Sequence, residues 1–280
     1  MPFCDLHVHS HFSDGTDAPA EIIRAAEGLG LSHVALCDHN TVAGLPDFLA
    51  AARDSAVTAV AGAEFSVNYN RTELHLLGLF IPEKRFSEVD TLMTEVLARK
   101  EVCHRETIGS LRRAGYDLDY DEIARAFPEA RINRAHIATV MTERGYVSSV
   151  AEAFETLLAK DGPHYREPKR PDVFEMIDFI RGIGAVPVLA HPFLSLSPEE
   201  LAAFLPKAKA RGLVGMECYY STFNADETAL ALSLARENGL LPSGGSDYHG
   251  STKPDIALGV GHGNLCIPDE WAMALAAQRA

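Results

Sequence analysis

Histidine and acidic side chains recur where predicted strands end. His7 and His9 lie two residues apart, at and just beyond the end of an apolar segment, residues 3–8, that predicts a strand. Side chains two apart on a strand share a face, so the two imidazoles point the same way. Neutral imidazole binds Zn, Mn and Fe, and the pair therefore predicts half of a metal site.

Further residues that could donate a lone pair to a metal lie at the ends or at the start of later apolar segments. Asp247 and His249 repeat the two-residue spacing after residues 240–245, and His191 follows residues 185–190. The whole candidate set is His7, His9, Asp14, His39, Glu64, His75, His191, Asp247 and His249. These donors exceed what one ion needs, so we predict two or three divalent metal ions, with Mn, Fe and Zn all compatible. The alternative is a scatter of structural histidines.

Strands and helices alternate around these donors. The predicted strands are residues 3–8, 32–36, 57–63, 74–81, 185–190, 213–218 and 240–245. The predicted helices between them are residues 19–28, 44–54, 171–181, 197–210 and 225–237. This alternation is typical of a parallel α/β protein, and about seven such strands indicate a barrel. Functional groups then belong at the carboxyl ends of the strands.

The alternation stops between residues 83 and 165, where the apolar residues follow helical spacing. We predict a helical insertion over 83–165, contributing to substrate binding, in a barrel built from residues 1–82 and 166–280. Within it, Asn133 is a good N-cap for a helix whose first turn holds Arg134 and His136. Such a helix start favours an anion. The alternative is that Arg134 is a solvated surface charge.

Composition limits the partners. The chain has 280 residues, 47% hydrophobic and 23% charged, without a run of eighteen apolar residues, which predicts a globular protein that does not cross a membrane. Donors near residue 7 stand where a signal peptide would be apolar, so we expect a cytoplasmic location. The net charge of −14 argues against long duplex nucleic acid but is compatible with a small anionic substrate bound through metals. The five cysteines predict reduced, buried thiols.

The motifs resemble those of the polymerase-and-histidinol-phosphatase (PHP) superfamily of metal-dependent phosphoesterases. The resemblance spans the chain in order and rests on residues 5–10, 13–15, 38–40, 190–192 and 245–249, with Glu64 and His75. It implies a distorted seven-stranded (β/α) barrel. It also implies a first metal held by His7, His9, Glu64 and Asp247, a second by Glu64, His75 and His191, and a third by Asp14, His39 and His249.

The resemblance also implies the chemistry. Two close cations can activate a bridging water and neutralise the phosphoryl oxygens. Asp14 replaces a histidine common in histidinol phosphatases and polymerase PHP domains, which, with the insertion, favours the subgroup acting on nucleoside 3′,5′-bisphosphates, short 5′-phosphorylated RNA or cyclic phosphates. The alternatives are a cyclic or sugar phosphate phosphoesterase, a histidinol phosphatase, or a non-catalytic metal-binding domain.

Five residues receive further roles, beyond or in addition to metal binding. Asp247 could move protons, although a ligand role alone would explain it. In the resembling subgroup an Arg-x-His pair grips a substrate phosphate, which assigns Arg134 and His136 to substrate binding. Lys253 could hold a second phosphate or be a solvated loop lysine. Glu217, at a strand end, could support a histidine ligand.

Overall fold

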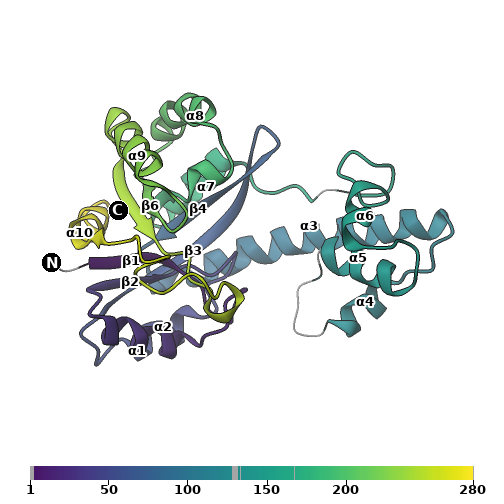
Figure 1. Ribbon diagram of the computed structural model, residues 1–280, viewed down its shortest axis with the longest axis horizontal. Helices are drawn as coiled ribbons and strands as arrows, with labels where there is room; N and C mark the ends of the chain where they lie inside the picture. The colour runs from purple at the N-terminus through teal and green to yellow at the C-terminus, as the bar shows by residue number, and fades with distance from the viewer. Residues whose placement is uncertain (1–2, 128–131, 133, 167, 280) are drawn as a thin grey trace. The chain divides into compact units, whose positions relative to one another are not determined.

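The computed structural model describes residues 3–127, 132, 134–166 and 168–279 (Figure 1). The chain forms two compact units, one of Met1–Met93 with Pro171–Ala280 and one of Thr94–Arg170. The strands are β1 (Phe3–Val8), β2 (His33–Leu36), β3 (Thr58–Tyr69), β4 (Thr72–Leu79), β5 (Val186–Leu189), β6 (Gly215–Tyr220), β7 (Leu241–Gly245) and β8 (Ile267–Pro268). The α-helices are α1 (Pro19–Leu29), α2 (Leu45–Ala51), α3 (Phe86–Arg113), α4 (Tyr120–Ala126), α5 (Arg134–Glu143), α6 (Val150–Glu155), α7 (Val173–Gly182), α8 (Pro198–Ala210), α9 (Ala225–Glu237) and α10 (Asp269–Ala276). Short 3₁₀ helices are η1 (Glu83–Arg85), η2 (Pro192–Leu194) and η3 (Gly250–Thr252).

The larger unit is built on one eight-stranded sheet in the order β7-β6-β5-β4-β3-β2-β1-β8. Its two ends approach each other, because the segment after β7 bonds to the end of β1. The Asp247 amide donates to the His7 carbonyl, and the His9 amide donates to the Tyr248 carbonyl, both at 2.9 Å. The sheet is therefore a nearly closed barrel, which confirms the predicted fold class. Helices α1 and α2 lie on one side of the strands, and α7, α8 and α9 on the other (Figure 1).

Barrel closure depends on the glycine that ends β7. A Cβ at Gly245 would lie 2.2 Å from the Cβ of His7 and 2.7 Å from its backbone nitrogen. A side chain at this position is excluded, so the two backbones touch here. This contact brings Asp247 and His249, just after β7, beside His7 and His9.

Two expectations about the strands were wrong. The two-residue β8 pairs antiparallel with β1 and makes the sheet eight-stranded; it is too short to be recognised as an apolar segment. The expectation of an all-parallel sheet also fails, because β4 runs antiparallel to both β3 and β5. Asn70 and Arg71, which join β3 to β4, have φ of 47° and 70°, as a tight hairpin turn requires. This hairpin also extends β3 to Tyr69, beyond its predicted end.

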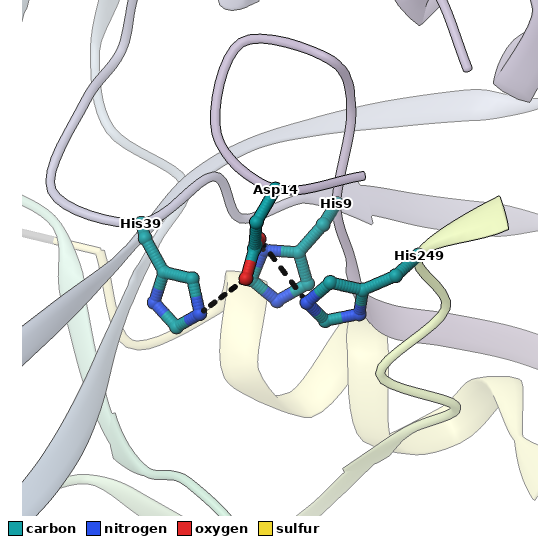
Figure 2. Close-up of side chains that lie close together, drawn as sticks. All are labelled: His9, Asp14, His39 and His249. Atoms are coloured by element: carbon teal, nitrogen blue, oxygen red, sulfur yellow. Dashed lines mark ion pairs between the residues drawn. The ribbon is translucent and has the colours of Figure 1, made fainter. Parts of the chain in front are cut away.

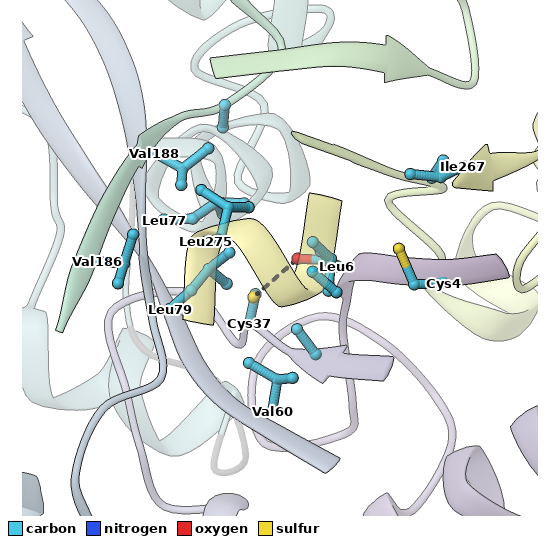
Figure 3. Close-up of a cluster of buried hydrophobic side chains, with 13 residues drawn as sticks. Cys4, Leu6, Cys37, Val60, Leu77, Leu79, Val186, Val188, Ile267 and Leu275 are labelled. Carbon is cyan, nitrogen blue, oxygen red and sulfur yellow. Dashed lines mark hydrogen bonds between the residues drawn. The ribbon is translucent and has the colours of Figure 1, made fainter. Parts of the chain in front are cut away.

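A buried apolar cluster lies within the larger unit (Figure 3). Cys37 belongs to it, and its thiol donates to the Leu6 carbonyl at 3.5 Å. Helix α10, which the sequence analysis did not identify, contributes Ala272 and Leu275. All five cysteines are free, but only three are buried: Cys266 is exposed and Cys103 is half-buried, contrary to the prediction.

The smaller unit has an apolar core of its own, formed by α4, α5, α6 and the end of α3. Ile108 and Leu111 of α3 pack with Ile137 and Met141 of α5 in this core. The division between the two units falls within α3, whose first two turns belong to the larger unit. Across the described parts of the chain, no helix is long and apolar enough to cross a membrane.

Candidate metal centre

The first group of donors joins β1, β3 and the segment after β7. Nε2 of His9 lies 3.1 Å from Nε2 of His7 and 3.1 Å from Oδ1 of Asp247. Oε2 of Glu64 lies 3.2 Å from Nε2 of His7 and 3.3 Å from that of His9. Four ligands about 2.1 Å from a tetrahedral ion lie roughly 3.4 Å apart, so this group has the spacing of a metal site.

A second group gathers on the other oxygen of Glu64. Its Oε1 lies 2.8 Å from Nδ1 of His75 and 2.9 Å from Nε2 of His191. His75 reaches this point because β4 is antiparallel: the early part of β4, where His75 pairs with Ser66, lies at the barrel end where the parallel strands finish. Glu64 therefore stands between two groups of donors, as a carboxylate shared by two ions would.

The third group surrounds Asp14, in the loop after β1 (Figure 2). Asp14 Oδ1 lies 3.2 Å from Nε2 of His249 and 3.7 Å from Nδ1 of His9, and Oδ2 lies 3.7 Å from Nε2 of His39. All nine predicted donors thus come together. Their division differs in one respect from the implied sets, since His9 and His39 each face two groups.

The donors fit divalent ions in their chemistry as well as their spacing. Nδ1 of His39 and Oε2 of Glu64 are buried and lie 3.0 Å apart, and among the described residues neither atom makes a hydrogen bond. A buried polar atom without a partner costs free energy, and metal coordination would use both lone pairs. A mixed nitrogen and oxygen set of this kind accepts Mn, Fe or Zn.

The carboxylates and imidazoles of the three donor groups shift one another's pKa values. Burial raises the pKa of Glu64, but the charges of His7, His75 and His39 outweigh it and hold the pKa well below its usual range. Burial lowers the pKa of His75, yet the charge of Glu64 and the hydrogen bond to it raise the pKa overall to about 10. For His39 burial dominates and lowers the pKa to about 4. Glu64 is consequently ionised at neutral pH and presents both oxygens as acceptors.

Buried partners orient the donors. Glu217 of β6 lies 3.0 Å from Nδ1 of His7 and accepts the amide of His191 at 2.7 Å, which are contacts that its predicted supporting role would require. Asp38, after β2, accepts from the amide and hydroxyl of Ser10 at 2.8 and 2.6 Å. It thereby fixes the start of the loop that carries Asp14.

Two donors have unusual backbone geometry. His191 has φ of 24° and Asp247 has φ of 56°, a region that residues with a side chain rarely adopt. Such conformations persist where the surrounding structure holds them, and they cluster at functional sites. The sequence carries no sign of this strain.

One neighbour of the centre escaped the sequence analysis. The Tyr220 hydroxyl, at the end of β6, donates to Oδ2 of Asp247 at 2.7 Å. Strict alternation along β6 would place Tyr219, and not Tyr220, on the same side as Glu217. The register shifts between Glu217 and Tyr219, and this bulge is invisible in the sequence.

The predicted substrate residues lie in both units. Arg134 and His136 are in the first turn of α5, in the smaller unit; their proposed cap, Asn133, lies outside the described residues. The guanidinium of Arg134 lies 4.3 Å from the ring of Phe154 and donates to the Leu158 carbonyl at 3.3 Å, so it is packed and not simply solvated. Lys253 is in the larger unit, and its ammonium lies 2.7 Å from Oδ2 of Asp247.

Known proteins resemble this chain over most of its length. A 5′-3′ exoribonuclease from Haemophilus influenzae is 30% identical, covering 88% of this chain and 89% of the relative. A 3′,5′-nucleoside bisphosphate phosphatase from Chromobacterium violaceum is 27% identical, covering 89% and 88%. A phosphoribosyl 1,2-cyclic phosphate 1,2-diphosphodiesterase from Eggerthella lenta is 29% identical, covering 88% and 94%.

A solved structure agrees with these relatives. A metal-dependent phosphoesterase from Bifidobacterium adolescentis superposes with a TM-score of 0.73 at 25% identity, covering 100% of this chain and 97% of that one. Fold, donors and relatives together define a metal-dependent phosphoric ester hydrolase. The chain belongs to the PHP domain family, which matches residues 5–181. The alternative of a non-catalytic metal-binding domain is left without support.

Proposed function

We propose that this enzyme hydrolyses a nucleoside 3′,5′-bisphosphate or a short 5′-phosphorylated RNA, using two or three divalent ions. The observation that carries the proposal is the position of Glu64, whose two oxygens face separate groups of histidines. A shared carboxylate is the arrangement expected of paired ions that act on one phosphoryl group. Relatives named for an exoribonuclease and for a nucleoside bisphosphate phosphatase support this substrate class.

The proposed ligand sets follow the three groups of donors. The first ion is held by His7, His9, Glu64 and Asp247, the second by Glu64, His75 and His191, and the third by Asp14, His39 and His249. When bound, such ions supply a Lewis acid for the phosphoryl oxygens and an activated water. The side chains set the positions: Glu217 fixes the ring of His7, and the packed barrel end excludes bulk water from Glu64, which is 1% exposed. Asp247 acts as a ligand in this scheme.

Substrate selection is proposed for Arg134, His136 and Lys253. Packing against Phe154 and the bond to Leu158 hold the Arg134 guanidinium at the start of α5, where the helix dipole also favours an anion. A guanidinium restricted in this way loses little entropy when it binds a phosphate. Lys253 is 38% exposed, so its ammonium can contact a phosphate while it remains near Asp247.

A cyclic phosphate is the second candidate substrate. The diphosphodiesterase relative supports this substrate specifically, because it is 29% identical and the match covers 94% of its length. Histidinol phosphate and sugar phosphates are the remaining alternatives.

Substrate profiling tests the proposal. The Mn²⁺-loaded protein would be assayed with adenosine 3′,5′-bisphosphate, 5′-phosphorylated oligoribonucleotides, a ribose 1,2-cyclic phosphate and histidinol phosphate. We expect the highest kcat/KM with the bisphosphate or the RNA. A kcat/KM at least tenfold higher for the cyclic phosphate or histidinol phosphate would contradict the proposed substrate class, while leaving the metal centre intact.

A further inference from the structure

The two oxygens of Asp247 have different surroundings. Oδ1 faces the donor histidines, at 3.1 Å from His9 and 3.7 Å from His7. Oδ2 points to the other side, where it accepts the Tyr220 hydroxyl and the Lys253 ammonium, each at 2.7 Å. Both lone pairs of Oδ2 are thus engaged, and Oδ1 is the oxygen left for an ion.

Tyr220 reaches Asp247 because of the bulge in β6. Tyr219 and Tyr220 are adjacent, and the bulge directs Tyr220 to the side already occupied by Glu217. Tyr219 packs against the apolar cluster shown in Figure 3. Bulges redirect side chains and are common beside active sites, and the bulge in β6 directs the Tyr220 hydroxyl to Asp247.

β6 therefore supports donors from three other segments. Glu217 contacts His7 and the amide of His191, while the ring of Tyr220 lies 5.2 Å from the ring of His191 and its hydroxyl binds Asp247. Tyr220 and Glu217 are 4% and 0% exposed, so their contacts are shielded from bulk water. None of the nine proposed ligands comes from this strand.

We infer that Tyr220 is a positioning residue that, together with Lys253, restricts Asp247 to binding an ion through Oδ1 alone. The inference rests on the proposed metal centre. A carboxylate held by one oxygen suits a small ion with few ligands, whereas a freely turning carboxylate binds in either mode and more weakly. The same contacts leave Asp247 without a free oxygen for proton transfer, so its role is to hold an ion.

The test compares two adjacent tyrosines. Tyr220→Phe removes the hydroxyl that binds Asp247, and Tyr219→Phe is a matched control with the same chemical change on the other side of the bulge. Mn²⁺ dissociation constants would be measured for each ion by competition with a chelating dye, in the absence of substrate. Thermal melting of the chelator-treated proteins would confirm that both variants are folded.

We expect Tyr220→Phe to lower the affinity for one Mn²⁺ ion about 10- to 100-fold, because loss of a partner that orients a ligand has this effect. Tyr219→Phe should bind Mn²⁺ with wild-type affinity. Activity of Tyr220→Phe should fall at limiting Mn²⁺ and recover at excess. Unchanged dissociation constants, or a kcat loss that excess Mn²⁺ does not restore, would overturn the inference. If Tyr220→Phe does not fold, Lys253→Met is measured in its place. Lower affinity for one Mn²⁺ ion is then the expected result, and wild-type affinity would refute the inference. Because the readout needs no substrate, failure of the proposed substrate class is recognised separately.

Discussion

Replacing Glu64 by glutamine should empty two metal sites with one substitution. Glutamine keeps the volume of the side chain but loses its charge, and its NH₂ group must face at least two imidazole nitrogens whichever way the amide turns. Oε1 lies within 2.9 Å of two histidines, and Oε2 lies between 3.0 and 3.3 Å from three others. Removing one partner from a buried ion pair costs about 3 to 5 kcal/mol, or roughly a hundredfold to several thousandfold in a dissociation constant.

Metal content distinguishes this result from general damage. After dialysis against buffered Mn²⁺, elemental analysis of Glu64→Gln should show loss of the first and second ions. The third, at Asp14 and His249, should remain. Glu95→Gln, an exposed position on α3, is the control and should match the wild type. Turnover by Glu64→Gln should fall with its metal content. Wild-type metal stoichiometry and affinity in a folded Glu64→Gln protein would refute the shared-carboxylate reasoning.

Three further results are expected. His249→Ala should lose one ion and keep the other two by elemental analysis; loss of all three would mean that the groups are not separate. Gly245→Ala should lower the free energy of unfolding by about 1 to 3 kcal/mol or more in urea titrations, since its Cβ would meet His7, whereas Gly28→Ala, with open space around it, should not destabilise the protein. Arg134→Ala should lower kcat/KM roughly ten- to a hundredfold for adenosine 3′,5′-bisphosphate and little for an aryl phosphate; equal losses for both would remove it from phosphate binding.

The sequence alone determined which residues could hold metals. The two-residue spacing of His7 and His9 predicts a shared face, because strand geometry sets which side chains point the same way. Asp247 and His249 repeat this spacing just beyond the end of β7. The alternation of strands and helices likewise indicates that strand ends meet at one edge, which predicts the gathering of the donors that follow strands. His75, near the start of its strand, falls outside this rule. These inferences needed only the type and order of residues.

Only the tertiary structure decided how the donors are shared and supported. The reversal of β4 that brings His75 to Glu64 depends on two residues in a turn, and apolar patterns carry no direction. The placement of His9 and His39 between two groups depends on distances across the barrel. Tyr220 contacts Asp247 through a one-residue shift in β6, which changes the side of every later side chain without altering the composition of the strand. Register and strand direction are set by long-range pairing, and they are therefore the features of this centre that the sequence did not reveal.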